Sequence, residues 1–211
     1  DKLKHNGCKV CIACETSNSV QGQDVPLSEK AVLSAVEMVA FGAKIEELAA
    51  FTAGQGVDLV YHHHMGTVVE TPVEIDAFMA ATGPATKLLF DAGHCYFGGD
   101  GVDPAPMLRK YVDRVRHFHA KNVRPEVMRQ VRDTGMSFMD GVRAGVFTVP
   151  GDPEGGVEFG PLLRILKEAG YDGWIVIEAE QDPDQRNPFE YQSLGLKTLK
   201  GAAAEVGLIA G

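Results

Sequence analysis

Three consecutive histidines are the first residues whose types and spacing could do chemistry. His62, His63 and His64 follow a short apolar run that ends at Tyr61. If that run is a β-strand, its period of two directs His62 and His64 to one face and His63 to the other. Two imidazoles buried side by side are costly unless they transfer a proton or bind a metal ion. We therefore predict a chemical role for His62 and His64 and a packing role for His63.

Polar side chains of the same kinds follow three other apolar runs. They are Asp91 with His94, His117 with His119 and Lys121, and Glu178 with Glu180. Glu178 and Glu180 fall on one face of a strand, and like charges in a cleft cannot both ionise cheaply without a cation. With His62, His64 and Glu70, the chain offers mixed carboxylate and imidazole ligands. Such ligands suit Mn²⁺, Co²⁺, Fe²⁺, Zn²⁺ or Mg²⁺ without selecting one.

Strands and helices must alternate along the chain to place these groups together. Short apolar runs typical of strands lie at 9–13, 57–61, 87–90, 115–119 and 174–177, with a weaker one at 146–149. Helices are expected at 28–52 with a bend near Gly42, from 72 to Gly83, at 103–111 and at 161–169. Thr71 and Glu74 form a capping box, which starts the second of these helices. The alternation predicts a parallel sheet covered by helices.

The places of the polar residues favour one of the two ways in which such a sheet can be built. An open doubly wound sheet and a (β/α)8 barrel both carry their sites at the carboxyl ends of strands, but here the polar residues are spread over several strands, which favours the barrel. A (β/α)8 barrel takes about 250 residues, whereas this chain has 211 and begins with Asp1. We therefore expect residues 1–211 to form a single, partial barrel domain that lacks its first units.

Composition and charge exclude several classes of function. The chain is 45% hydrophobic and 23% charged, as in globular proteins that bury a core. No stretch reaches the roughly 18 to 20 apolar residues that a membrane-spanning helix needs. The formal net charge of −9 repels phosphate backbones, so nucleic acid is a poor partner. We expect a protein that acts on a small molecule, and a homo-oligomer stays open.

The cysteines support a reducing compartment more than a metal cluster. Three of the four lie in Cys8-x-x-Cys11-x-x-Cys14, which resembles the start of an iron-sulfur run but lacks its fourth cysteine and proline. On a strand, Cys11 would face away from the other two. We predict packing roles and a cytoplasmic protein, with a non-catalytic metal or iron-sulfur module as a remote alternative. Nucleotide-binding, serine-hydrolase and zincin motifs are absent from the sequence.

Five segments carry a resemblance to a known family. They are Tyr61 to Thr71, Asp91 to His94, His119 to Glu126, Gly145 to Gly151 and Glu178 to Pro183. In this order, and over almost the whole chain, they closely resemble the myo-inosose-2 dehydratases of the xylose isomerase-like TIM barrel superfamily. The resemblance implies a metal-dependent lyase that removes water from 2-keto-myo-inositol (scyllo-inosose) to give a trihydroxycyclohexane-dione in inositol catabolism. It also implies a (β/α)8 barrel that begins with two further βα units.

The same resemblance implies roles for particular residues. Metal ligands are implied at Asp91, His119 and Glu178, with Glu70 as the expected fourth ligand and His62 as the alternative, and with Mn²⁺ or Co²⁺ as the expected ion. Elimination of water then needs a base and an acid. We assign His62 or His64 to take the proton and His94 or Lys121 to assist the leaving hydroxyl. A metal-dependent sugar isomerase or epimerase of the same fold shares the metal and the enolate, and stays the alternative function.

Overall fold

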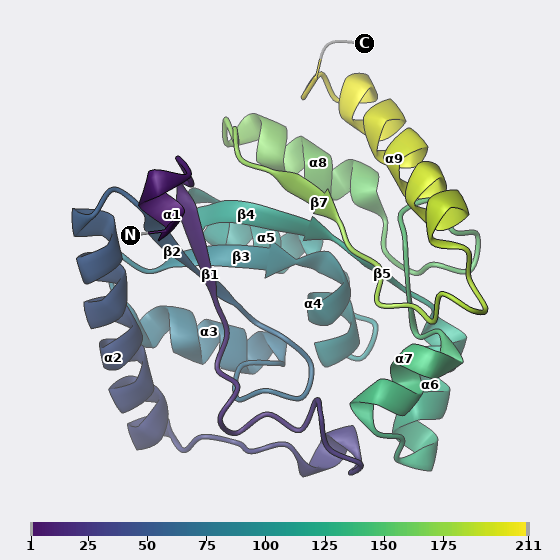
Figure 1. The fold of residues 1–211 in the computed structure, drawn as a ribbon, viewed down its shortest axis with the longest axis horizontal. Coiled ribbons are helices and arrows are strands. Elements are labelled where there is room, and N and C mark those ends of the chain that lie inside the picture. The colour runs from purple at the N-terminus through teal and green to yellow at the C-terminus, as the bar shows by residue number, and fades with distance from the viewer. Residues whose placement is uncertain (1, 210–211) are drawn as a thin grey trace.

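The computed structural model describes residues 2–209, and five parallel strands form its main sheet (Figure 1). In spatial order they are β1 (Val10–Ala13), β2 (Asp58–His62), β3 (Lys87–Asp91), β4 (Val115–Ala120) and β7 (Ile175–Ile177). All four pairings are parallel, and spatial order follows chain order without a reversal. A doubly wound sheet reverses its strand order at a switch point, whereas a barrel does not. The expected architecture of a (β/α)8 barrel is therefore confirmed for this part of the barrel.

Helices alternate with the strands, and some of them cover one face of the sheet. They are α1 (Lys2–His5), α2 (Ala35–Gly54), α3 (Pro72–Ala81), α4 (Ala92–Gly98), α5 (Ala105–Tyr111), α6 (Pro125–Thr134), α7 (Phe138–Ala144), α8 (Phe159–Glu168) and α9 (Pro188–Glu205). Figure 1 shows α3, α5 and α8 behind the sheet, with α2 along the β1 side and α9 along the β7 side. Among residues 2–209, no helix combines the length and the apolar character needed to cross a membrane.

The two faces of the sheet differ because side chains alternate along each strand. Tyr61, Phe90 and Phe118 are fully buried among the helices, where the rings of Phe90 and Phe118 stack with centroids 6.0 Å apart. The next residues along the same strands, His62, Asp91 and His119, point to the opposite face. The apolar core therefore fixes the position of the polar side chains one residue away.

One predicted helix begins later than the sequence pattern suggests. The expected helix at 28–52 is wrong over its first part: residues 27–29 form a short 3₁₀ turn and α2 begins at Ala35. The reason is a capping box, in which the Ser34 side chain accepts from the Glu37 N–H and the Glu37 side chain accepts from the Ser34 N–H. The helix continues through Gly42, where a Cβ atom would lie 2.6 Å from that of Ala81, so Gly42 permits close packing against α3.

The weaker strand at 146–149 forms, but outside the parallel sheet. β6 (Phe147–Thr148) pairs antiparallel with β5 (Asn122–Val123). Buried Arg124 fixes this pair, because its N–H donates to the Val146 carbonyl at 2.8 Å and its guanidinium donates to the Gly145 carbonyl at 2.6 Å. The β5–β6 pair therefore lies beyond the end of β4, beside the polar residues described next.

Candidate active site

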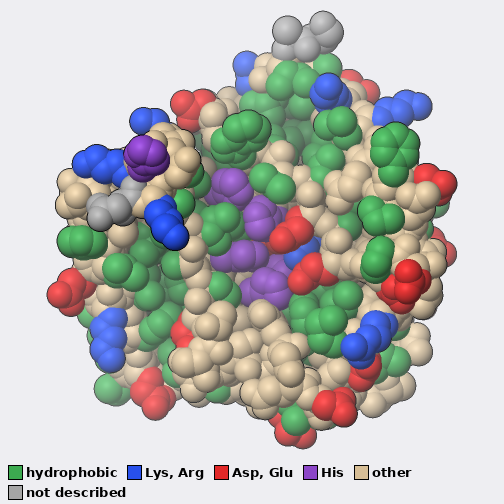
Figure 2. All heavy atoms as spheres, in the orientation of Figure 1, with side chains coloured by type: hydrophobic (Ala, Val, Ile, Leu, Met, Phe, Trp, Pro, Cys, Tyr) green, Lys and Arg blue, Asp and Glu red, His purple; other side chains and the backbone are tan. Residues whose placement is uncertain are grey.

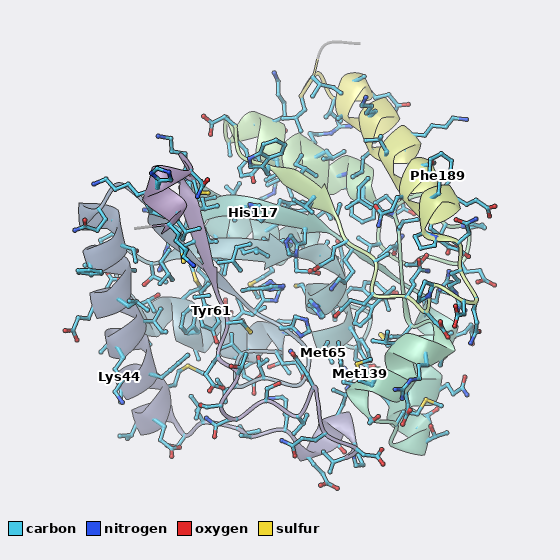
Figure 3. The ribbon with its side chains drawn as sticks, viewed as in Figure 1. Lys44, Tyr61, Met65, His117, Met139 and Phe189 are labelled. Carbon is cyan, nitrogen blue, oxygen red and sulfur yellow. The ribbon has the colours of Figure 1, made fainter. Side chains whose placement is uncertain are left out.

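Five of the seven histidines gather at the centre of the uncovered face of the sheet: His62, His64, His94, His117 and His119. Figure 2 shows a cluster of histidine side chains in a hollow, with acidic side chains and a basic one beside it. In Figure 3, His117 lies over the middle of the sheet and Met65 lies farther along, toward α7. The groups come from the carboxyl ends of β2, β3, β4 and β7, as sites do in barrels of parallel strands.

Four of these side chains come close enough to share a metal ion. His62, Asp91, His119 and Glu178 each offer a ligand atom, and these atoms lie within 4.8 Å of one another. His119 Nδ1 lies 3.2 Å from Asp91 Oδ2 and 2.9 Å from Glu178 Oε2. Although burial opposes it, these two carboxylates raise the pKa of His119 to about 9. Burial is likewise outweighed at Glu178, whose pKa falls to about 2 because of His119 and Lys121.

His62 fits the same group as a neutral ligand. Its side chain is buried, and its Nδ1 has no hydrogen-bond partner among the described residues. Burial holds the pKa of His62 well below its usual value, which leaves a lone pair for a cation. Two imidazoles and two carboxylates are ligands that divalent transition metals accept, so the residues present fit a metal ion.

A buried lysine joins this group to a second one. Lys121 is fully buried, and its Nζ lies 3.0 Å from Glu178 Oε2, 2.7 Å from Glu180 Oε2 and 2.9 Å from His94 Nε2. It also lies 3.7 Å from Asp91 Oδ2. Burial alone would lower the pKa of Lys121, but the surrounding carboxylates raise it, so the side chain is an ammonium. This ammonium is the cation that balances the clustered acids.

His62 and His64 lie on one side of the sheet and His63 lies on the other, as the sequence predicts. The rings of His62 and His64 lie 5.1 Å apart, and that of His64 lies 3.6 Å from that of His94. His63 is fully buried on the other side, where its Nε2 accepts the Asp91 N–H at 3.2 Å. Burial lowers the pKa of His63 to about 4. His63 therefore supports the strand end that carries Asp91.

The structure does not bring Glu70 to the metal-ligand group. Its Oε2 accepts the Gly66 N–H at 2.6 Å, which closes the loop between β2 and α3. Gly66 has a φ of 75°, so the chain turns there, and among residues 2–209 the ligand group that contains Asp91 does not include Glu70. Burial raises the pKa of Glu70 to about 7. His62, which the sequence offers as the alternative fourth ligand, lies in this group instead.

The cysteine motif does not gather either. Cys8, Cys11 and Cys14 are free thiols, and among residues 2–209 none of them belongs to a group that could hold a metal ion. Burial raises the pKa of Cys14 to about 11, so it is protonated. This geometry favours packing over an iron-sulfur module.

Comparison with known proteins agrees with the fold. The sequence profile described as "Xylose isomerase-like TIM barrel" matches residues 6–201. The chain belongs to this xylose isomerase-like family. Within it, the chain is 43% identical over 206 residues to the rhizopine catabolism protein MocC of Rhizobium meliloti, covering 97% of this chain and 62% of MocC. It is 46% identical over 194 residues to the inosose dehydratase of Geobacillus thermodenitrificans, covering 90% and 64%.

A solved structure of the xylose isomerase-like fold gives the same architecture. The IolI protein, determined with a bound zinc atom, superposes with a TM-score of 0.62 at 16% identity, covering 97% of this chain and 66% of IolI. The chain thus spans about two thirds of the length of the proteins that it matches. At this identity the likeness shows the fold alone, so the metal site of this chain is argued from its own residues.

Two residues near the site carry no assigned role in the sequence-based prediction. Glu180 lies on the same face as Glu178, but its contacts to Lys121, His64 and His94 cannot be read from spacing. Gln21 lies 2.5 Å from His64 Nδ1 through its Nε2. No sequence motif surrounds Gln21, so its contact with His64 becomes visible only from the path of the β1–α2 connection.

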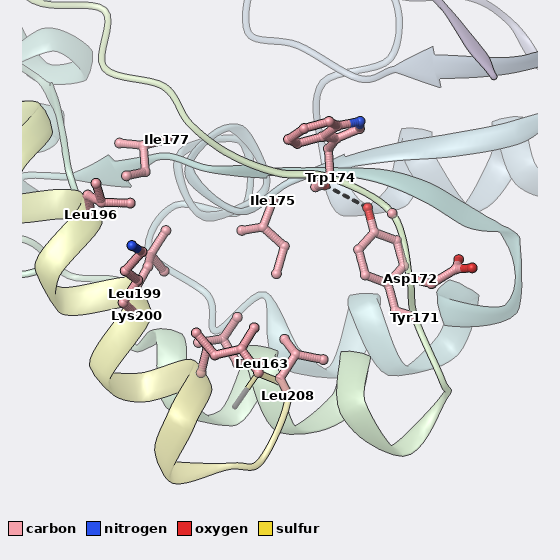
Figure 4. Close-up of a pocket in the computed structure, with 13 residues that line it drawn as sticks. Leu163, Tyr171, Asp172, Trp174, Ile175, Ile177, Leu196, Leu199, Lys200 and Leu208 are labelled. Carbon is pink, nitrogen blue, oxygen red and sulfur yellow. Dashed lines mark hydrogen bonds between the residues drawn. The ribbon is translucent and has the colours of Figure 1, made fainter. Parts of the chain in front are cut away.

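A separate hollow on the molecule lies away from these groups. It is formed by β7, α8 and α9 and is mainly apolar, with Leu163, Ile175 and Leu199 among its lining residues (Figure 4). Its one hydrogen bond drawn in the figure joins the Tyr171 hydroxyl to the Trp174 carbonyl at 2.7 Å. It lacks clustered titratable side chains, so it is not a second candidate for catalysis.

Proposed function

We propose that the protein removes water from 2-keto-myo-inositol to give a trihydroxycyclohexane-dione, as a metal-dependent hydro-lyase of inositol catabolism. The observation that carries the proposal is the group of His62, Asp91, His119 and Glu178, whose ligand atoms lie within 4.8 Å of one another beside Lys121. Relatives named inosose dehydratase, at 42 to 46% identity, support the choice of reaction and substrate. Mn²⁺ or Co²⁺ is the ion that we propose for the site.

His62, Asp91, His119 and Glu178 would hold a divalent ion, which when bound would supply Lewis-acid stabilisation of the negative charge that develops as a proton leaves the carbon beside the ketone. Stabilisation of this kind is worth several kcal/mol. The buried Nδ1 of His62, which has no hydrogen-bond partner within residues 2–209, supports this assignment. His62 then serves as a ligand and not as the base.

Side chains of the second group would move the protons. Lys121 Nζ has a hydrogen to give and is held by Glu180 and His94 at 2.7 and 2.9 Å, so we assign the Lys121–His94 pair to the departing hydroxyl. His64 and Glu180 face the same space, with Nε2 and Oε1 3.9 Å apart. One of them takes the proton from carbon. Each such positioned group supplies roughly 10² to 10⁴ in rate.

Mass spectrometry of the product tests this proposal. Incubation of the protein and 2-keto-myo-inositol with Mn²⁺ or Co²⁺ should give a product one water lighter than the substrate. Chelator treatment should abolish the reaction, and the divalent ion should restore it. Asp91→Asn, which keeps the size of a buried ligand, should be inactive, and Asp184→Asn on the exposed loop before α9 should be active. A product of unchanged mass would favour the isomerase or epimerase, and full activity without metal would overturn the metal-dependent mechanism.

A further inference from the structure

The connection between β1 and α2 crosses the loop that carries His64. The Val20 N–H donates to the Gly66 carbonyl at 2.9 Å, and Gln21 Nε2 donates to the Met65 carbonyl at 3.1 Å. Val20 is buried and Gln21 is partly buried. Two successive residues of the connection are therefore bonded to two successive residues of the His64 loop, which fixes one segment against the other.

The Met65 carbonyl determines which way the Gln21 amide faces. A carbonyl oxygen can only accept, so the amide atom 3.1 Å from it must be the nitrogen of Gln21. The same nitrogen lies 2.5 Å from His64 Nδ1. A primary amide has two hydrogens, and the two acceptors take one each. The orientation of the Gln21 amide is thus set by the Met65 carbonyl oxygen, which can only accept a hydrogen bond.

This orientation determines where the imidazole hydrogen of His64 lies. If Nδ1 carried a hydrogen, it would face an N–H of Gln21 at 2.5 Å, with two donors head to head. Nδ1 also lies 2.9 Å from the Met65 carbonyl, whose second lone pair could accept that hydrogen, but the shorter contact decides, because the Gln21 N–H would then press against another N–H at 2.5 Å. Nδ1 is therefore the acceptor, and a neutral imidazole with an accepting Nδ1 carries its hydrogen on Nε2.

The hydrogen on Nε2 faces the site. Nε2 lies 3.9 Å from Glu180 Oε1, and the ring lies against that of His94. We propose that Gln21 is a positioning residue that holds His64 as the Nε2–H tautomer, so that His64 donates a hydrogen bond to a substrate oxygen and does not act as the base. The assignment of the hydrogen stands on the contacts of Gln21, whereas the donation to substrate rests on the proposed dehydration. Glu180 is then the group that takes the proton from carbon.

The same tautomer bears on a second group of imidazoles. His62, His64 and His94 also offer ligand atoms within 4.8 Å of one another. A ligand nitrogen must have a free lone pair, whereas Nε2 of His64 carries a hydrogen and Nδ1 is occupied by Gln21. The Lys121 ammonium 2.9 Å from His94 Nε2 opposes a cation there as well. This triad is therefore suited to hydrogen bonding with substrate and not to a second metal ion.

Nitrogen-15 NMR of the histidine side chains tests the tautomer directly. The resonances of His64 are identified by their loss in His64→Asn, and in the parent protein they should show the Nε2–H tautomer. Gln21→Glu replaces the donor with an acceptor and should move the hydrogen of His64 to Nδ1. Gln23→Glu adds the same charge two residues away, where Gln23 is exposed, and should leave the tautomer unchanged. A hydrogen on Nδ1 in the parent, or no response to Gln21→Glu, would overturn the inference.

A neutral variant provides a second test that does not depend on whether the charged variant Gln21→Glu folds. Gln21→Met keeps the length of the side chain and removes both N–H groups, so the His64 resonances should show a mixture of tautomers. With 2-keto-myo-inositol, kcat should fall at least about tenfold while KM changes less, because a donor aimed at developing charge acts in the transition state. A loss confined to KM would contradict the assigned role. If the Nε2–H tautomer is observed but no water is eliminated, the proposed reaction fails and the positioning role of Gln21 stands.

Discussion

Glu70 should make the protein less stable as the pH rises from acid to neutral. Burial raises the pKa of this carboxyl from 4.5 to about 7, so the folded protein binds its proton more tightly than the unfolded chain does. Between these two values the folded state holds the extra proton, and stability falls as the pH increases. A shift of about 2.5 units at 1.36 kcal/mol per unit amounts to about 3 kcal/mol above pH 7. Below pH 4.5 both states are protonated and the penalty is absent.

The substitution Glu70→Gln removes this penalty and keeps an acceptor for the Gly66 N–H. Urea unfolding at pH 5 and at pH 8 should show that Glu70→Gln is more stable than the parent at pH 8, by up to about 3 kcal/mol, and that the difference shrinks at pH 5. Glu47→Gln, at an exposed position of α2, is the control. Its stability should depend on pH in the same way as that of the parent. If Glu70→Gln is destabilising at pH 8, the folded protein uses the ionised carboxylate, and the burial argument is wrong.

Two further pairs of substitutions test the charge balance and the histidine faces. Lys121→Met leaves the carboxylates of Asp91 and Glu180 without their buried partner. In protein treated with a chelator, the free energy of unfolding should therefore fall by about 3 kcal/mol. Thermal melting should show this as a fall in Tm of about 6 to 12 °C. Lys110→Met breaks the exposed pair with Asp76 and should change Tm little, and equal losses in both variants would contradict this reasoning. His64→Asn should lower turnover of 2-keto-myo-inositol at least about a hundredfold and His63→Asn should do less, whereas the reverse ranking would show that the faces are exchanged.

The sequence pattern predicts the strands well because each strand is a short apolar run with polar residues after it. The predicted run at 115–119 and the observed Val115–Ala120 differ by one residue. The face of His62 follows from the period of two. Asp91, His119 and Glu178 come together because they lie at the same end of parallel neighbours. These features depend on local periodicity, which a sequence displays.

Features that depend on the path of a loop are not visible in the pattern. Glu70 is misplaced because the turn at Gly66 directs the chain back, and nothing in the spacing reports that turn. Gln21 reaches His64 across 43 residues of chain. The start of α2 is a different case, since Ser34 and Glu37 have the spacing of a capping box. That spacing marks the start of α2 in the sequence itself.

The alternation of faces in β2, β3 and β4 also limits how this site can change during evolution. A substitution at His62 or His119 replaces a reactive group while Tyr61 and Phe118 keep the core intact. An inserted or deleted residue in the same strands exchanges the two faces at once, so that apolar rings enter the site and polar groups enter the core. Point substitutions at these strand ends can therefore alter the polar groups while the core stays unchanged. Changes in length are accessible only in the connecting loops, such as the one that carries Gln21.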